Sequence, residues 1–237
     1  MNDQISDNQI MRHVTKDITN EGVTEYLLRF YSPLTEELGN LRMESDKTAI
    51  PVILQETEDF LGTLIEIIRP ERIFEIGTSV GYSAMFFTEK MLEMGISHPE
   101  VYTSEVDEET YRIAERNFSD MGYSKYIKGF FGDGQTVAES LLDDGVRPFD
   151  MVFIDAAKSH YRRFLEASLP ILSPGGVVIL DDTLFQGRPA LDPEEPPRKH
   201  RTNTKALREF NDFVNEDPRF TSSLLSIGNG LTLIKVK

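Results

Sequence analysis

The chain contains 237 residues, of which 39% are hydrophobic, and this size and composition suit one α/β domain with a substantial core. It has no cysteine, which excludes disulfides, zinc–thiolate sites and thiol nucleophiles. With 40 acidic against 25 basic residues its formal charge is -15. Such a surface repels phosphate backbones on average, so broad nucleic-acid binding is disfavoured. The clearest local basic patch is the run Arg-Lys-His-Arg at 198–201.

The sequence shows no sign of a membrane segment or a secretion signal. No apolar run approaches the roughly 20 residues that span a bilayer. The polar N-terminus lacks the apolar centre of a signal peptide, so a cytoplasmic protein without a membrane partner is expected. We expect residues 1–237 to form a single domain, with 1–20 as a flexible tail and 21–70 as N-terminal helices.

Two hydrophobic patterns alternate along most of the chain. Helical spacing of apolar residues first predicts helices over 23–31 and 49–68. From Arg72, short apolar runs predict strands at 72–77, 101–106, 126–133, 149–156 and 175–183. Amphipathic stretches between and after them predict helices at 82–92, 109–121, 136–142 and 161–172. This alternation is typical of βαβ units and predicts a parallel sheet covered on both faces.

The pattern changes after Thr183. Four prolines exclude regular structure from the loop 184–201, and a helix is predicted over 204–217. Two β-runs, 220–227 and 231–237, flank Gly-Asn-Gly and predict a hairpin. We therefore expect an α/β fold whose mostly parallel sheet ends in an antiparallel C-terminal hairpin.

The predicted strands all end in acidic residues or glycine. Ligands of open parallel sheets bind beyond the carboxyl ends of the strands, so these residues are expected to meet at one edge. They are Glu75, Gly77, Glu105, Gly132, Asp133, Gly134, Asp155, Asp181 and Asp182.

The turn after the first strand indicates the kind of ligand. Gly77 lets a ligand approach the backbone, and the following helix offers free N–H groups. The spacing of Gly77 and Gly81 does not match the G-x-G-x-x-G that a pyrophosphate needs. S-adenosylmethionine has no phosphate, and its carboxylate suits the helix N-terminus and Ser83. The alternative is that both glycines only form a tight turn.

Two further strand ends complete the predicted cofactor site. Glu105 is placed to accept both ribose hydroxyls, while Asp133 or the Gly134 backbone is placed to meet the adenine. The cationic sulfonium suits the acids near it.

Asp155, Asp181 and Asp182 come from neighbouring strand ends and predict an all-oxygen cation site. Such a site favours Mg²⁺, with Mn²⁺ or Ca²⁺ as alternatives. The other interpretation is that Asp155 caps a turn and Asp182 faces solvent. Lys158, three residues after Asp155, is placed to act as a general base if a metal and a sulfonium lower its pKa. Alternatively it is an exposed loop lysine.

These motifs together resemble the cation-dependent O-methyltransferases, the family of catechol and caffeoyl-CoA O-methyltransferases. The resemblance runs from about Ile50 to the C-terminus, on the segments 74–84, 153–161, 173–187 and 228–231. It implies a Rossmann-like class I methyltransferase fold with seven strands, and a homodimer. The cofactor residues are then expected to be Glu75, Gly77, Ser79, Ser83, Glu105, Asp133, Gly134 and Asp155. The resemblance also implies that Asp155, Asp181 and Asp182 bind the metal and that Lys158 is the catalytic base.

The chain departs from the family pattern at two places. The family usually has Asn at the position of Asp182, and it often has Met and Gly near 53–57. An extra negative charge at Asp182 is expected to bind the cation more tightly but to weaken its polarising effect.

The acceptor is left open between a catechol-like small molecule and a tRNA anticodon loop. The segment 210–220 is similar to the bacterial tRNA hydroxyuridine methyltransferase branch, whose substrate has a hydroxyl beside a ring carbonyl. The -15 charge opposes a large tRNA footprint, whereas Arg198, Lys199, Arg201 and Lys205 favour a small one.

The expected reaction is in-line methyl transfer to a hydroxyl that lies beside a second chelating oxygen. A nicotinamide-dependent oxidoreductase shares the early βαβ pattern but is disfavoured by the glycine spacing and the terminal hairpin. A non-catalytic nucleotide-binding module is the other alternative, and Asp182 is its supporting feature.

Overall fold

The structure is a computed structural model and describes residues 21–194 and 196–237. The predicted tail 1–20 lies outside these residues. The α-helices are α2 (Glu21–Leu28), α3 (Glu36–Thr48), α4 (Gln55–Ile68), α5 (Tyr82–Glu93), α6 (Glu108–Asp120), α7 (Gly134–Asp143), α8 (Tyr161–Ser168) and α9 (Arg201–Glu216). The strands are β1 (Arg72–Ile76), β2 (Glu100–Glu105), β3 (Ile127–Phe131), β4 (Phe149–Ile154), β5 (Leu172–Leu180), β6 (Phe220–Leu225) and β7 (Leu231–Val236).

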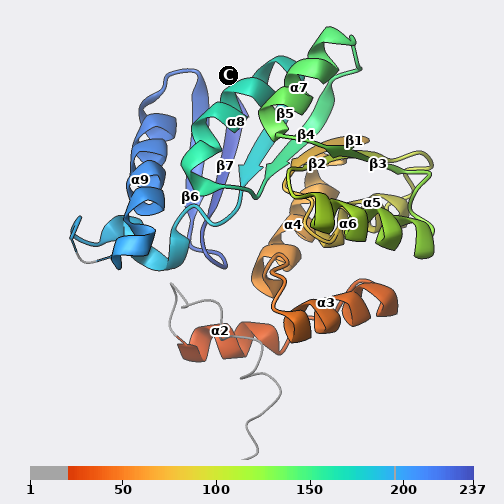
Figure 1. Cartoon of the computed structure of the whole chain (residues 1–237), viewed down its shortest axis with the longest axis horizontal. Helices are drawn as coiled ribbons and strands as arrows, with labels where there is room; N and C mark the ends of the chain where they lie inside the picture. The colour runs from red at the N-terminus through yellow and green to blue at the C-terminus, as the bar shows by residue number, and fades with distance from the viewer. Residues whose placement is uncertain (1–20, 195) are drawn as a thin grey trace, which may run out of the picture.

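All seven strands form one sheet in the order β3-β2-β1-β4-β5-β7-β6 (Figure 1). Strands β1 to β5 pair in parallel, whereas β7 runs antiparallel to both β5 and β6. The predicted mostly parallel sheet with a C-terminal antiparallel hairpin is therefore confirmed. The strand order changes direction beside β1 and β4, which is where ligands of such sheets bind.

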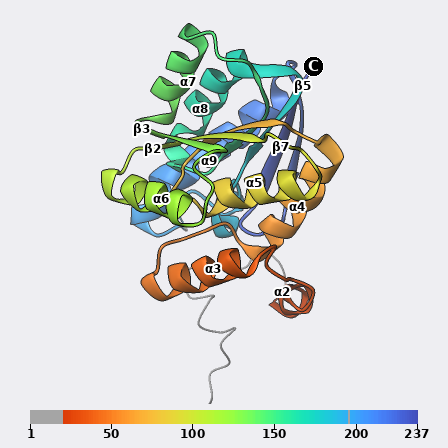
Figure 2. The same ribbon diagram turned by 90° about the vertical axis from the view of Figure 1, so that its right-hand side faces the viewer.

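Helices cover both faces of the sheet because side chains of the inner strands alternate between two apolar cores. On β4, Met151 and Phe153 belong to the core beneath α4, α5 and α6. Val152 and Ile154 belong to the core beneath α7, α8 and α9. Figures 1 and 2 show α2 and α3 as an outer layer beyond α4 and α5. None of the described helices combines the length and apolar character needed to cross a membrane.

The predicted helix over 49–68 is wrong in its first turns. Helix α3 ends at Thr48, the next residue Ala49 adopts a left-handed conformation with φ of 56°, and α4 begins only at Gln55. Pro51 explains the interruption, because its ring disfavours a helical conformation of the preceding residue and it has no N–H to donate. The segment 50–54 between the two helices forms part of the wall of the main cavity.

Candidate active site

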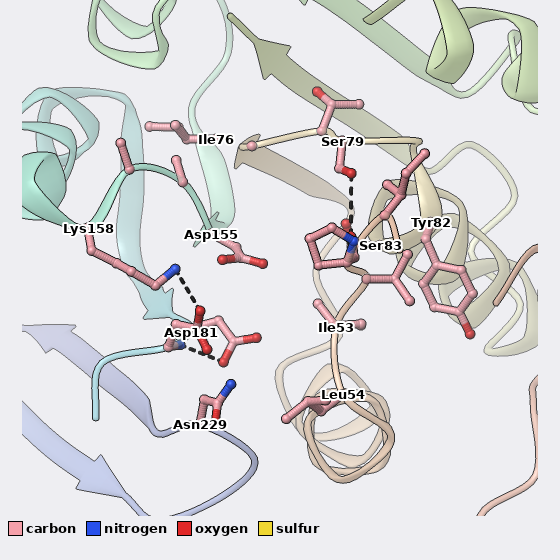
Figure 3. Close-up of a pocket in the computed structure, with 18 of the residues that line it drawn as sticks. Ile53, Leu54, Ile76, Ser79, Tyr82, Ser83, Asp155, Lys158, Asp181 and Asn229 are labelled. Carbon is pink, nitrogen blue, oxygen red and sulfur yellow. Dashed lines mark hydrogen bonds and ion pairs between the residues drawn. The ribbon is translucent and has the colours of Figure 1, made fainter. Parts of the chain in front are cut away.

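A cavity of about 1000 Å³ opens at the carboxyl ends of β1, β2, β4 and β5. In Figure 3, Lys158, Asp155, Asp181 and Asn229 lie on one side of it. Ile53, Leu54, Ser79 and Ser83 lie on the other side. Every predicted site residue except Glu75 lines this cavity, so the strand ends meet at one edge as the sequence analysis expects.

The turn after β1 leaves no room for a side chain. Gly77 has φ of 105°, and a Cβ atom there would lie 1.9 Å from the backbone oxygen of Asp155. Only glycine fits a left-handed conformation with such a close backbone approach. The turn leads into α5, whose first residues Tyr82 and Ser83 line the cavity, so free N–H groups of the helix N-terminus lie close to it.

Glu105 at the end of β2 is held in one orientation by backbone groups. The N–H of Ser79 donates to its Oε2 at 2.8 Å, and the N–H groups of Val106 and Asp107 donate to its Oε1 at 2.9 Å each. Three backbone donors therefore fix the orientation of this carboxylate. The carboxylate joins the glycine turn of β1 to the end of β2, where an acceptor for ribose hydroxyls is predicted.

Glu75 lies behind the cavity wall. It is fully buried, and its carboxyl accepts hydrogen bonds from Ser83 Oγ and Thr103 Oγ1, both at 2.5 Å. Burial raises the pKa of Glu75 to about 8, although the two hydroxyl donors oppose the shift. Glu75 therefore orients Ser83 on the cavity surface and does not reach the cavity itself.

Asp133 is paired with an arginine that the sequence analysis did not single out. Arg163 of α8 binds both carboxylate oxygens of Asp133, with nitrogen–oxygen distances of 2.7 and 2.6 Å. This bidentate pairing, together with the N–H of Gln135, keeps the pKa of Asp133 below its ordinary value. Both residues line the cavity. No local pattern marks Arg163, because its partner lies 30 positions away in the sequence.

Burial disfavours the ionised forms of the acids at the ends of β4 and β5. Asp181 is 5% exposed, and burial raises its pKa well above the ordinary value, with Asp155 and Asp182 adding to the effect. Burial also raises the pKa of Asp155, to about 6, against the opposing charge of Lys158. Tyr161 fixes this edge, because its hydroxyl donates to the backbone oxygen of Asp181 at 2.7 Å.

Lys158 turns back over the acids, as the sequence analysis predicts. Its Nζ lies 2.6 Å from Oδ2 of Asp182. Burial lowers the pKa of Lys158, but the charges of Asp155 and Asp182 outweigh it, so the pKa lies above the ordinary value. The expected lowering presupposes a bound metal and sulfonium. Without them the carboxylates hold the ammonium in its charged form.

The three aspartates do not surround a common point. In the described part of the chain, no group of three or more His, Asp and Glu side chains has the arrangement of a metal centre. Asp182 makes its ion pair with Lys158, while its N–H donates to Oδ1 of Asp181 at 2.7 Å. The metal ligation by Asp155, Asp181 and Asp182 stays a prediction.

A buried polar network supports the opposite wall. Arg42 of α3 donates to the backbone oxygen of Ile53 at 2.9 Å and forms a buried ion pair with Glu58 of α4. The hydroxyl of Tyr82 also donates to Glu58, at 2.8 Å. The network therefore joins α3, α4 and α5 around the segment 50–54. The sequence analysis missed Arg42 and Glu58, since residues that distant in sequence leave no periodic signal.

Positive charges gather at another part of the cavity wall. Arg188, Lys199 and His200 line the cavity, and burial together with the charges of Arg188 and Lys199 lowers the pKa of His200. Of the four basic residues that the sequence analysis relates to a tRNA footprint (Arg198, Lys199, Arg201 and Lys205), only Lys199 lines the cavity. Arg201 instead pairs with Glu194 at 2.7 Å, and Lys205 pairs with Glu209 at 3.7 Å.

Comparison with known proteins identifies the family. A family model described as O-methyltransferase matches residues 31–237. The chain belongs to this O-methyltransferase family. Tapetum-specific methyltransferase 1 of Arabidopsis thaliana is 31% identical over 211 residues, which cover 89% of this chain and 86% of that protein. Caffeoyl-CoA O-methyltransferase of Stellaria longipes is 25% identical over 210 residues, which cover 85% and 83%.

Solved structures place this O-methyltransferase in the same fold. The O-methyltransferase of Bacillus cereus, in complex with S-adenosylhomocysteine, has a TM-score of 0.76 at 23% identity over 91% of this chain and 97% of that one. The Rossmann-like methyltransferase fold and the O-methyltransferase assignment are therefore confirmed. Because the chain belongs to this family, the alternative of a nicotinamide-dependent oxidoreductase is set aside.

Proposed function

We propose that this O-methyltransferase transfers a methyl group from S-adenosylmethionine to a hydroxyl that lies beside a second oxygen, with the help of a divalent cation. The observation that carries the proposal is the meeting of Glu105, Asp155, Asp181 and Lys158 around one cavity at the switch point of the sheet. One group of these residues suits the methyl donor, and the other suits the cation and the acceptor.

The turn after β1 and the end of β2 support the position of the donor. The glycine turn at Gly77 and the N-terminus of α5 suit the carboxylate of the methionine moiety, with Ser83 oriented by Glu75. The fixed carboxylate of Glu105 suits the ribose hydroxyls. At the adenine end, Asp133 is already engaged by Arg163, so the backbone of Gly134 is the better partner for the base.

The acids at the ends of β4 and β5 suit a hard divalent cation. Their donors are all oxygen atoms, and burial raises the pKa of Asp155 and Asp181, so a bound cation would favour the ionised form of both. We propose that Asp155 and Asp181 hold Mg²⁺, or Mn²⁺ or Ca²⁺ in its place, with Asp182 as a third ligand. Such an ion, when bound, lowers the pKa of an acceptor hydroxyl.

Lys158 is the proposed proton acceptor. Its Nζ lies in the same cavity, and Asp182 fixes its position. Because the surrounding carboxylates raise its pKa, Lys158 becomes neutral only when their charge is compensated. Its basicity is therefore coupled to occupation of the acidic site, which restricts proton removal to the assembled complex.

The acceptor is proposed to combine two neighbouring oxygens with a negatively charged group. Arg188 and Lys199 give the cavity a positive side that the net charge of -15 does not suggest. The relative from Stellaria longipes is named for a coenzyme A ester, which carries phosphates. A tRNA wobble hydroxyuridine offers the same pair of chemical features and is the second candidate.

The test is transfer of a labelled methyl group from S-adenosylmethionine in the presence of Mg²⁺. Three acceptors are offered separately: catechol, a catechol with a carboxylate side chain, and unmodified bacterial tRNA. Transfer to the carboxylated catechol in preference to catechol supports the proposal. Full activity in excess chelator contradicts the role of the cation, and transfer to tRNA alone selects the second candidate.

We also propose a homodimer. Apolar side chains of α2 support it, because Tyr26 is 55% exposed and Phe30, just beyond the helix, is 66% exposed. Light scattering after size-exclusion chromatography distinguishes the dimer from the monomer.

A further inference from the structure

Asn229 is a polar residue of the cavity to which the proposed function assigns no role. It lies in the turn between β6 and β7, is 7% exposed, and lines the cavity together with Asp155 and Asp181. Its Oδ1 atom is fully buried and has no hydrogen-bond partner among the described residues. Buried side-chain oxygens nearly always have a partner, so the observed orientation leaves Asn229 one partner short.

The backbone holds Asn229 firmly beside the acidic strand end. The N–H of Leu184 donates to the backbone oxygen of Asn229 at 3.0 Å, and the N–H of Thr183 donates to that of Gly230 at 2.9 Å. Gly230 has φ of 99°, and a Cβ atom there would lie 2.5 Å from the nitrogen of Leu184. The hairpin turn is therefore packed directly against the segment that follows Asp182, and Asn229 is fixed in place by the fold.

The amide side chain faces the acids. In Figure 3, Asn229 lies next to Asp181, with its amide nitrogen on the side of that residue. An amide nitrogen is the natural neighbour of carboxylates that have no cation between them. Because the two ends of an asparagine amide have nearly the same shape, a half-turn presents Oδ1 to the same space.

We propose that Asn229 is a ligand of the divalent cation, through its amide oxygen, in addition to the aspartates. This inference rests on the cation of the proposed function. Hard cations bind amide oxygens of asparagine alongside carboxylates in mixed sites. A neutral oxygen also suits this site, since Asp182 already adds a negative charge and shares its carboxylate with Lys158. The hairpin would then contribute to the site as well as to the sheet.

The experiment measures Mn²⁺ binding to the full chain by calorimetry and electron paramagnetic resonance, without methyl donor or acceptor. Replacement N229A is expected to weaken Mn²⁺ binding by about 10-fold or more, the loss typical of disturbed metal sites. Affinity for S-adenosylhomocysteine is expected to stay unchanged, since its proposed contacts lie at the turn after β1, the end of β2 and the N-termini of α5 and α7. The matched control is N40A, which makes the same change at an exposed position of α3.

A charge-conserving exchange of two residues keeps the inference testable even if N229A does not fold. The double variant D182N/N229D keeps one amide and one carboxylate in the site, and its Mn²⁺ affinity is expected to exceed that of D182N/N229A clearly. Equal Mn²⁺ affinity of wild type and N229A overturns the inference and leaves the proposed function intact. Absence of Mn²⁺ binding by the wild type overturns the cation of the proposed function, and the role of Asn229 with it.

Discussion

The buried carboxyl of Glu75 makes the stability of the protein depend on pH in a defined direction. Its pKa is raised from 4.5 to about 8, because burial penalises the ionised form. Below pH 4.5 the carboxyl is protonated in both the folded and the unfolded state. Above that pH the unfolded chain loses the proton while the folded chain keeps it, so the free energy of unfolding falls as pH rises. The fall ends above the folded pKa of about 8.

The magnitude follows from the size of the shift. One pKa unit corresponds to about 1.4 kcal/mol, so the full displacement amounts to about 5 kcal/mol, of which about 3 kcal/mol falls between about pH 5 and pH 8. The two hydroxyl donors, Ser83 and Thr103, are already included in the shift, and they lower it. A change of this size is a large part of the stability of a domain.

The assay compares wild type with Glu75→Gln by urea unfolding at a series of pH values. Glutamine stays neutral, so other titrating groups cancel in the difference between the two proteins. Wild type is expected to lose stability relative to Glu75→Gln across the neutral range. Glu44→Gln, at an exposed position of α3, is the control and should give a constant difference. A constant difference for Glu75→Gln as well would refute the reasoning, because the hydroxyls would then fully stabilise the ionised carboxylate.

Three other outcomes are expected. Lys158→Ala should lower kcat on the order of 100- to 10,000-fold while the Kd for S-adenosylmethionine changes little, and equal losses in both would contradict a role as base. Arg42→Met should cost about 3–5 kcal/mol in urea unfolding, because Glu58 is left buried and unpaired, and adding Glu58→Gln should recover part of the loss. Lys199→Ala should raise KM for a carboxylated catechol more than KM for catechol, as initial rates will show; equal changes would mean that Lys199 does not bind the acidic group.

The sheet could be predicted from the sequence because its signals are local. The alternation on β4 and the turn at Gly228–Gly230 each depend on neighbouring residues. The positions of the strand ends could be predicted from the same patterns. For that reason Asp155 and Asp181 were correctly expected to lie at one edge of the sheet, where both line the cavity. The helix over 49–68 failed because Pro51 interrupts it, although its apolar spacing continues.

The missed residues depend on contacts between distant segments. Arg42 meets Ile53 and Glu58 only after α3 folds against α4, and Arg163 meets Asp133 only when α8 lies beside α7. Asn229 was interpreted as a turn residue, which it is, but its side chain enters the cavity only because β7 inserts between β5 and β6. Local spacing carries no information on such pairings.

The distribution of charge in the cavity gives a physical reason for its two proposed substrates. Glu105, Asp155, Asp181 and Asp182 line the cavity, and Lys158 forms an ion pair with Asp182, so this group of acids favours further positive ligands. Arg188 and Lys199 give another part of the wall the opposite sign. A sulfonium and a divalent ion would compensate the first part, and an acceptor with an acidic group would compensate the second. Both substrates are then oriented by the same field, and orientation of two reactants supplies on the order of 7–11 kcal/mol to a transfer between them.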